Sequence, residues 1–268
     1  MKKYISIFKI RFINSLQYKT AALAGISTQV FFGIVFISVY LAFYESNNTS
    51  NISMNWKELV SYLWLNQIFF SLILTWTKDR NLISIIKNGN IAYEFIRPIN
   101  LYHKWFATMY ANRLANVLLR FLPATIIAFI IPQPYSLNLP YSILSFLTFI
   151  ISLIISSLVA TSFQMITHLL TIYTLDEKGI MTLFMVIGEI FSGGTVPIVF
   201  FPNILQKIAY LLPFRYICDL PFRIYSGNIK VYNAIPDLLN GILWIIVLFL
   251  VGIILSKKAT KKAIIQGG

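Results

Sequence analysis

A few ionisable and polar residues interrupt the long apolar segments of this sequence, and they are its natural candidates for chemistry. Arg113, Asn116 and Arg120 are three and four residues apart, so a helix places them on one face. Glu189 lies in another apolar segment, about ten residues and about 15 Å from one end of it. A charge at the centre of a bilayer costs about 2.5–3.5 kcal/mol, so these side chains should face a partner or a water-filled cavity. We favour an ion pair of Glu189 with Arg113 or Arg120 that fixes helix packing, and the alternatives are the polar lining of a translocation pathway and an Arg113 that extends to the membrane surface.

His168 is a second candidate, because its ordinary pKa would allow it to carry protons in a relay. It has Thr167 and Thr171 as sequence neighbours, and Ser162 precedes it by about one and a half helical turns. In an apolar helix such residues more commonly make hydrogen bonds to neighbouring helices. We therefore expect a structural His168 and keep the relay as the alternative.

Other chemistry is excluded by residue type and spacing. Residues 188–195 nearly match a phosphate-binding loop, but Gly194 stands where the lysine is required, and the segment lies in an apolar helix. There is no His and carboxylate spacing suited to a metal, no nucleophile with a base at an interpretable distance, and a single cysteine, Cys218. The sequence therefore predicts no metal site, no nucleotide site and no intrachain disulfide.

The elements that must position these residues follow from composition. The 268 residues are 57% hydrophobic and 12% charged, with a mean hydropathy of +0.73. Soluble domains carry about 25% charged residues, so a soluble enzyme or binding domain is excluded. The net charge of +13 is typical of loops that face an anionic cytoplasmic leaflet, so nucleic acid is not needed to explain it.

Apolar runs of about 20 residues predict an all-α integral membrane protein with six transmembrane helices. Prolines at 132, 134 and 140 divide a charge-free stretch into two of these helices. The predicted spans are 20–44, 59–77, a third that ends near residue 131, 141–174, a fifth that follows the turn at 176–179 and ends near 196, and 238–256.

The distribution of Lys and Arg predicts the orientation. Most of them lie before residue 20, in the loop 78–104 and after residue 256, so both termini are predicted to be cytoplasmic. Residues 1–19 place Ile5, Phe8, Phe12 and Leu16 on one helical face, which predicts an amphipathic helix at the cytoplasmic membrane surface. We treat residues 1–268 as a single transmembrane domain.

Two further segments do not span the membrane. In the loop 78–104, residues 91–96 form a short apolar and aromatic helix, which would either enter a groove of a partner or lie on lipid. Gly193, Gly194 and Pro197 break a helix near the outer surface, and the prolines at 202, 213 and 221 interrupt the amphipathic segment 200–232. We expect re-entrant helices there, and the alternative is a small extracellular cap.

Taken together, these features resemble the membrane subunit of a type-2 ABC exporter, and the resemblance covers essentially the whole chain. It rests on Phe8-Lys-Ile-Arg11 followed by Ala21-Ala-Leu-Ala-Gly-Ile-Ser-Thr-Gln29, on Gly89-Asn-Ile-Ala-Tyr-Glu-Phe-Ile-Arg-Pro98, and on Gly193-Gly-Thr-Val-Pro197 with Phe201-Pro202, Leu211-Leu-Pro213, Arg223 and Gly227.

The resemblance implies a role for each segment. Residues 1–19 would be the connecting helix, and a coupling helix would dock on an ATPase subunit through Asn90, Ile91, Tyr93, Glu94, Phe95 and Arg97. The glutamate-rich signature of the family is reduced here to Glu94. Residues 202–225 would close the outer end of the pathway, with an outer gate at Gly193, Gly194, Pro197, Pro202 and Pro213.

The resemblance also implies the assembly. ATP and Mg would bind to the partner ATPase and no cofactor to this chain, which would pair with a second permease, more plausibly a different one, in a bacterial plasma membrane. The competing hypothesis is a proton-coupled secondary transporter that uses Glu189 with Arg120 or His168, for which we find no inverted repeat. The composition suits an amphipathic or lipidic cargo and does not identify it.

Overall fold

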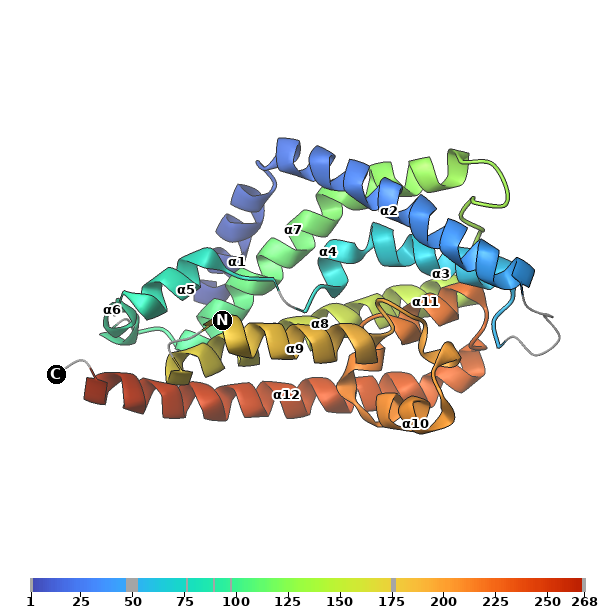
Figure 1. Ribbon diagram of the computed structural model, residues 1–268. Helices are drawn as coiled ribbons and strands as arrows, with labels where there is room; N and C mark the ends of the chain where they lie inside the picture. Colours follow the sequence, from blue (N-terminus) through green and yellow to red (C-terminus); the bar gives the residue numbers. More distant parts are fainter. Residues whose placement is uncertain are drawn as a thin grey trace.

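The chain folds into a bundle of helices, shown in Figure 1. This computed structural model describes residues 2–46, 53–75, 77–88, 90–96, 98–174 and 177–266, and all regular elements within those ranges are helices. In chain order they are α1 (Lys2–Ser15), α2 (Lys19–Ser46), α3 (Trp56–Ile68), α4 (Phe70–Ile73), α5 (Arg80–Lys87), α6 (Ile91–Ile96), α7 (Leu101–Ile130), α8 (Ile143–Thr174), α9 (Glu177–Ser192), η2 (Ile198–Phe200), α10 (Asn203–Leu211), η3 (Pro213–Tyr216), α11 (Asp219–Ser226) and α12 (Val231–Gln266).

Four of the described helices are long and apolar enough to cross a membrane: α2, α7, α8 and α12. They coincide with the first, third, fourth and sixth predicted spans, so the all-helical, multi-span class is confirmed. Many of their outward-facing side chains are exposed Leu, Ile, Val and Phe, which a bilayer would cover.

The other two predicted spans are shorter helices. In place of one helix over 59–77, α3 stops at Ile68 and the four-residue α4 follows, because the backbone departs from helical geometry at Phe69 (φ −95°, ψ 13°). Every residue of α3 from Leu59 to Ile68 is buried, so α3 is a core helix surrounded by the bundle. The fifth predicted span ends early, because α9 stops at Ser192 and Gly193 has a left-handed φ of 81°.

In Figure 1, α8 and α12 run alongside one another, α2 crosses α7, and α3 and α4 lie between α2 and α8. Helix α12 packs against α8, and α2 packs against α7 and α3. The half of the molecule that contains α5 and α6 also contains both ends of the chain, whereas α10 and α11 lie in the other half.

The main apolar cluster surrounds α3, and at the α5 and α6 end a second apolar cluster fixes these short helices to the bundle. Its buried members are Leu82, Ile86, Ile91, Leu101, Tyr102, Trp105, Met109, Met165, Leu169, Ile172 and Ala259, from α5, α6, α7, α8 and α12. Helix α1 lies against α7, where Ser15 Oγ donates a hydrogen bond to Asn112 Oδ1 (2.8 Å) and Phe8 contacts Tyr110. The sequence predicts a helix over the N-terminal segment, and the structure shows that this helix packs against α7.

Candidate functional site

A cavity of about 510 Å³ lies between α1, α4, α5, α7 and α8. Six basic side chains and two acidic ones are among the residues that line it: Arg11, Lys78, Arg80, Lys104, Arg113, Arg120, Asp79 and Glu94. Asn116 lines it as well, so the structure brings Arg113, Asn116 and Arg120 to one cavity, as their spacing predicts.

Arg113 is the most enclosed of these cations, with 4% of its surface exposed. Its guanidinium donates to the Leu72 carbonyl oxygen, and Nη2 donates to Gln164 Oε1 at 2.6 Å. Gln164 Nε2 in turn donates to the Thr77 carbonyl oxygen at 2.7 Å. Arg113 therefore ties α7 to the irregular end of α4 and, through Gln164, to α8.

Arg120 lies about two turns further along α7, where α7 meets α2. A Cβ atom at Gly25 would be only 2.7 Å from Arg120 Cζ, so the absence of a side chain at Gly25 makes room for the guanidinium. Gly25 is a neighbour of Arg120 that the sequence analysis did not single out, since no residue near Gly25 in the sequence indicates Arg120.

Glu189 lies apart from the two arginines. It lines a much smaller cavity together with Asn66, Thr75, Ser192 and Cys218. The described contacts of Arg113 go to a carbonyl and an amide oxygen, in place of the ion pair with Glu189 that the sequence favoured. Arginine and carboxylate are therefore placed in different cavities.

His168 is completely buried, and both of its ring nitrogens have hydrogen-bond partners. The Asp79 amide N–H donates to Nε2 (3.1 Å), and Nδ1 lies 2.8 Å from the Gln164 carbonyl oxygen. An amide only donates and a carbonyl only accepts, so Nδ1 carries the proton and the ring is neutral. His168 thus connects α8 to the beginning of α5, as the structural interpretation of this residue expects.

Replacing His168 with leucine should lower the free energy of unfolding by about 1–3 kcal/mol, because the Asp79 amide and the Gln164 carbonyl lose their partner at similar volume. His168→Gln, which offers an acceptor oxygen to the amide, should lose less. Thermal unfolding of the purified chain in detergent measures both. A His168→Leu variant as stable as the unchanged chain would contradict the structural role.

Helix α6 contains the residues assigned to coupling. Ile91 is buried in the second apolar cluster, whereas Tyr93 and Ile96 are 67% and 78% exposed. Asn90 forms the turn before the helix, and its carbonyl oxygen accepts the Tyr93 amide N–H (3.1 Å). Gly89, Arg97 and the side chain of Phe95 lie outside the described residues. Tyr93 and Ile96 therefore form an exposed apolar surface on α6, at the α5 and α6 end of the bundle.

Glu94, one of the six residues expected to dock on the ATPase, points inward. It is 8% exposed and forms an ion pair with Lys104 of α7. The sequence also missed the amphipathic helix α5 just before it. The signal was present: Asp79 caps the helix by accepting the N–H groups of Asn81 and Leu82, and Leu82, Ile83 and Ile86 form a buried face.

At the other end, Gly193 connects α9 to the outer segment. Tyr62 Oη donates to the Gly193 carbonyl oxygen (2.8 Å), and Asn66 Nδ2 donates to the Gly194 carbonyl oxygen (2.7 Å). Pro197 precedes η2, Pro202 precedes α10 and Pro213 begins η3, so each of the three prolines stands at the start of a helix. Four of the five residues assigned to the outer gate thus lie in turns between helices, and Pro213 begins a helix.

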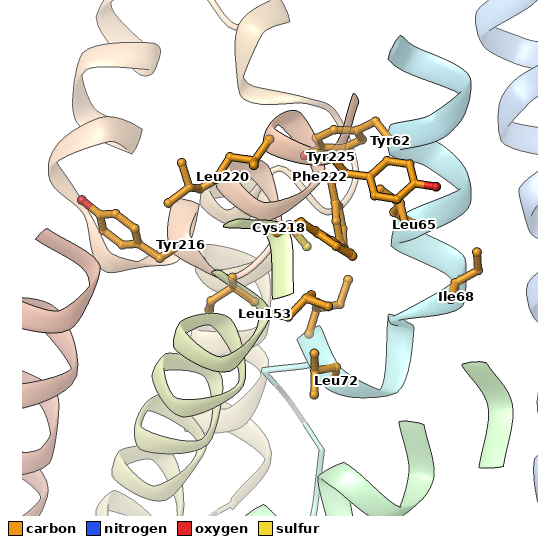
Figure 2. Packing of buried hydrophobic residues seen from close by; sticks show 14 of the residues in the cluster. Tyr62, Leu65, Ile68, Leu72, Leu153, Tyr216, Cys218, Leu220, Phe222 and Tyr225 are labelled. Carbon is orange, nitrogen blue, oxygen red and sulfur yellow. The ribbon is translucent and has the colours of Figure 1, made fainter. Parts of the chain in front are cut away.

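Helix α11 is inserted between α3 and α8, and Figure 2 shows its packing. Phe222 meets Tyr62 edge to face at 5.5 Å, and Tyr225 meets Phe149 at 5.1 Å. Ser156 Oγ of α8 donates to the Ile217 carbonyl oxygen at 2.6 Å. Helix α10, by contrast, exposes Ile204, Leu205, Ile208 and Leu211. The outer segment thus has one helix in the core and one with an uncovered apolar face.

Two ion pairs stabilise this segment, and the sequence analysis identified neither. Arg223 Nη1 lies 3.2 Å from Oδ2 of Asp219, which is fully buried, and Arg223 Nε donates to Asn228 Oδ1 at 2.7 Å. Arg215 is bidentate to Asp237 at 3.2 and 2.9 Å and stacks over the Tyr210 ring. The i, i+4 spacing of Asp219 and Arg223 was a signal for the first pair, whereas only the fold brings Arg215 to Asp237.

Four described helices are long and apolar enough to cross a membrane, α3 is buried in the core, and Arg113, Arg120 and Glu189 line cavities within the apolar helices. These features define a multi-pass membrane protein. Residues 29–267 match the ABC-2 family transporter protein family, and the chain belongs to that family. Its class is therefore that of a transport permease, a component that is not itself catalytic. No curated protein matches the chain.

Proposed function

We propose that this chain is the membrane-spanning permease subunit of an ATP-driven exporter in a bacterial plasma membrane. It forms the substrate pathway with a second, non-identical permease, and separate subunits bind ATP and Mg. Family membership over residues 29–267 is the observation that carries the proposal. In this arrangement the chain crosses the bilayer six times, with α3–α4 and α9 as the two short crossings, and both termini are cytoplasmic.

Coupling to the ATPase is assigned to α6. The second apolar cluster fixes α6 to α7 and α12, so a push on its exposed side moves the long helices rather than only the loop. Glu94 belongs to this anchorage through Lys104, and Tyr93 and Ile96 supply the contact surface. Closure of the ATPase subunits on ATP would thereby move the helices that line the substrate pathway.

The outer gate is assigned to the segment from Gly193 to Tyr225. Helix α11 would close the pathway as a re-entrant helix, and the exposed apolar face of α10 would lie in the outer leaflet. A proton-coupled mechanism is not favoured, because family membership supports an ABC permease and His168 is held as a neutral structural residue.

The double substitution Tyr93→Ala, Ile96→Ala should weaken association with the ATPase about 100-fold, since two exposed apolar anchors are removed from a short helix. Co-purification measures this: a tagged chain is isolated from its native membranes, and ATPase and permease partners are identified by mass spectrometry. The matched control is Ile5→Ala, Ile10→Ala, which removes two exposed isoleucines from α1.

The unchanged chain and the α1 control should bring down an ATPase and a second permease. If the α6 variant retains the ATPase undiminished, α6 is not the coupling helix. If no ATPase accompanies the unchanged chain, the proposed function itself fails.

A further inference from the structure

The large cavity near α5 carries more positive charge than structural roles account for. Only two of the described side chains that line it are acidic, and both are engaged. Glu94 pairs with Lys104, and the Asp79 carboxylate accepts the amides of Asn81 and Leu82 as the cap of α5. Arg11, Lys78, Arg80, Arg113 and Arg120 therefore converge on a space without a carboxylate of their own on its described wall.

Several donors on this wall also lack acceptors. Among the described residues, Arg113 Nε, Arg120 Nε and Trp105 Nε1 are buried without a hydrogen-bond partner. Arg113 and Trp105 are 4% and 1% exposed, so they are part of the interior rather than of a mobile surface. A buried donor that lacks an acceptor is costly, and a small shift of these side chains toward a ligand rich in acceptor oxygens would remove part of that cost.

The geometry points to a binding site for the phosphate group of an anionic amphiphile, and we propose that the cavity holds such a group. Guanidinium groups match phosphate oxygens in pairs. The terminal nitrogens of Arg113 already donate to Leu72 and Gln164, so Arg11, Arg80 and Arg120 supply the guanidinium groups that would meet the phosphate. About 510 Å³ is the size of a small-molecule site. Leu74, Leu82 and Ile85 add apolar wall for the part of the ligand next to the phosphate.

Lipid is one source of this phosphate, and a soluble phosphate compound is the other. The cavity lies between α1, predicted to rest at the cytoplasmic membrane surface, and α5, in the half with the basic loops. Phosphate headgroups of the inner leaflet are found at that level. Binding requires neither ATPase coupling nor a direction of transport, so the proposed function and this site can fail independently.

The test is equilibrium binding of radiolabelled phosphatidylglycerol to the full-length chain, purified and delipidated in detergent without other subunits. The unchanged chain should bind one lipid saturably, and excess unlabelled phosphatidylcholine should not displace it. The double variant Arg80→Gln, Arg120→Gln should bind about tenfold more weakly, because two charge-assisted contacts are lost. The matched control, Lys257→Gln, Lys258→Gln, removes the same charge from exposed residues of α12 and should bind normally.

The substitution Gly25→Ala tests whether binding depends on the position of Arg120 and not only on the net charge of the cavity. Its Cβ displaces the Arg120 guanidinium and leaves the net charge unchanged, so binding should weaken several-fold. Displacement of the lipid by millimolar inorganic phosphate would support the site and assign it to a soluble phosphate compound. The proposal would be overturned if neither phosphatidylglycerol nor inorganic phosphate bound saturably. It would also be overturned if the Lys257 and Lys258 control lost as much affinity as the Arg80 and Arg120 variant.

Discussion

Replacing Arg223 with methionine is expected to lower the free energy of unfolding by about 3–5 kcal/mol, the largest effect of any substitution considered. Asp219 is completely buried in α11, and Arg223 is its ion-pair partner at 3.2 Å. Methionine would leave that carboxylate without a cation in a low-dielectric interior. The same change would remove the bond from Arg223 Nε to Asn228, which itself donates to Glu58 at the start of α3.

Thermal unfolding in detergent, followed by tryptophan fluorescence, measures this loss as a fall in Tm of about 10 °C. Adding Asp219→Asn to the variant removes the orphaned charge and should recover more than half of the loss. Lys207→Met is the matched control, because Lys207 is exposed on α10, and it should change the Tm little. An Arg223→Met variant within 1 °C of the unchanged chain would show that α11 does not depend on this pair.

Gly193→Ala is expected to cost about 2–4 kcal/mol, for two separate reasons. Residue 193 has a φ of 81°, which costs an L-residue about 1–2 kcal/mol. A Cβ there would also lie 2.5 Å from Tyr62 Oη, and Tyr62 cannot easily move because it is fully buried against Phe222. The hydrogen bond from Tyr62 to the Gly193 carbonyl would be lost, which adds about 1–2 kcal/mol.

A double-mutant cycle distinguishes the two causes. Tyr62→Phe removes the clashing hydroxyl, so Gly193→Ala in that background should cost only the part due to positive φ. Gly194→Ala is the matched control, since its Cβ would meet Ser192 Oγ at 3.2 Å and its φ is not left-handed. The same unfolding assay applies. Equal losses from Gly193→Ala with and without the Tyr62 hydroxyl would remove Tyr62 from the explanation.

Both substitutions concern the outer segment, where the sequence left two interpretations open. The helix break at Gly193 and the short helices after it could be predicted, because Gly and Pro act locally on the backbone. The insertion of α11 between α3 and α8 could not, because the apolar residues of α11 could as well have faced lipid. The pairs Arg223–Asp219 and Arg215–Asp237 show the same limit, since they depend on how the short helices fold back.

The cytoplasmic end repeats this contrast. The short helix over 91–96 and its apolar character were evident from the residues. In the structure Glu94 faces Lys104, whereas Tyr93 and Ile96 face outward. This arrangement depends on the rotation of α6 against α7 and α12, which the sequence of a six-residue helix does not reveal. The placement of Glu189 and the two arginines in separate cavities likewise depends on how α7 and α9 pack.

By itself the sequence determined the class of the protein: an all-helical membrane permease whose four long helices lie where apolar runs of sufficient length predict them. Run length, charge spacing and Gly or Pro breaks are properties of neighbouring residues, so they can be read along the chain. Only the tertiary structure decided that α3 is a core helix, that Arg113 donates to two neutral oxygens, and that six cations line one cavity. Those outcomes depend on which helices are neighbours in space, and contacts between distant segments leave no periodic signal in the sequence.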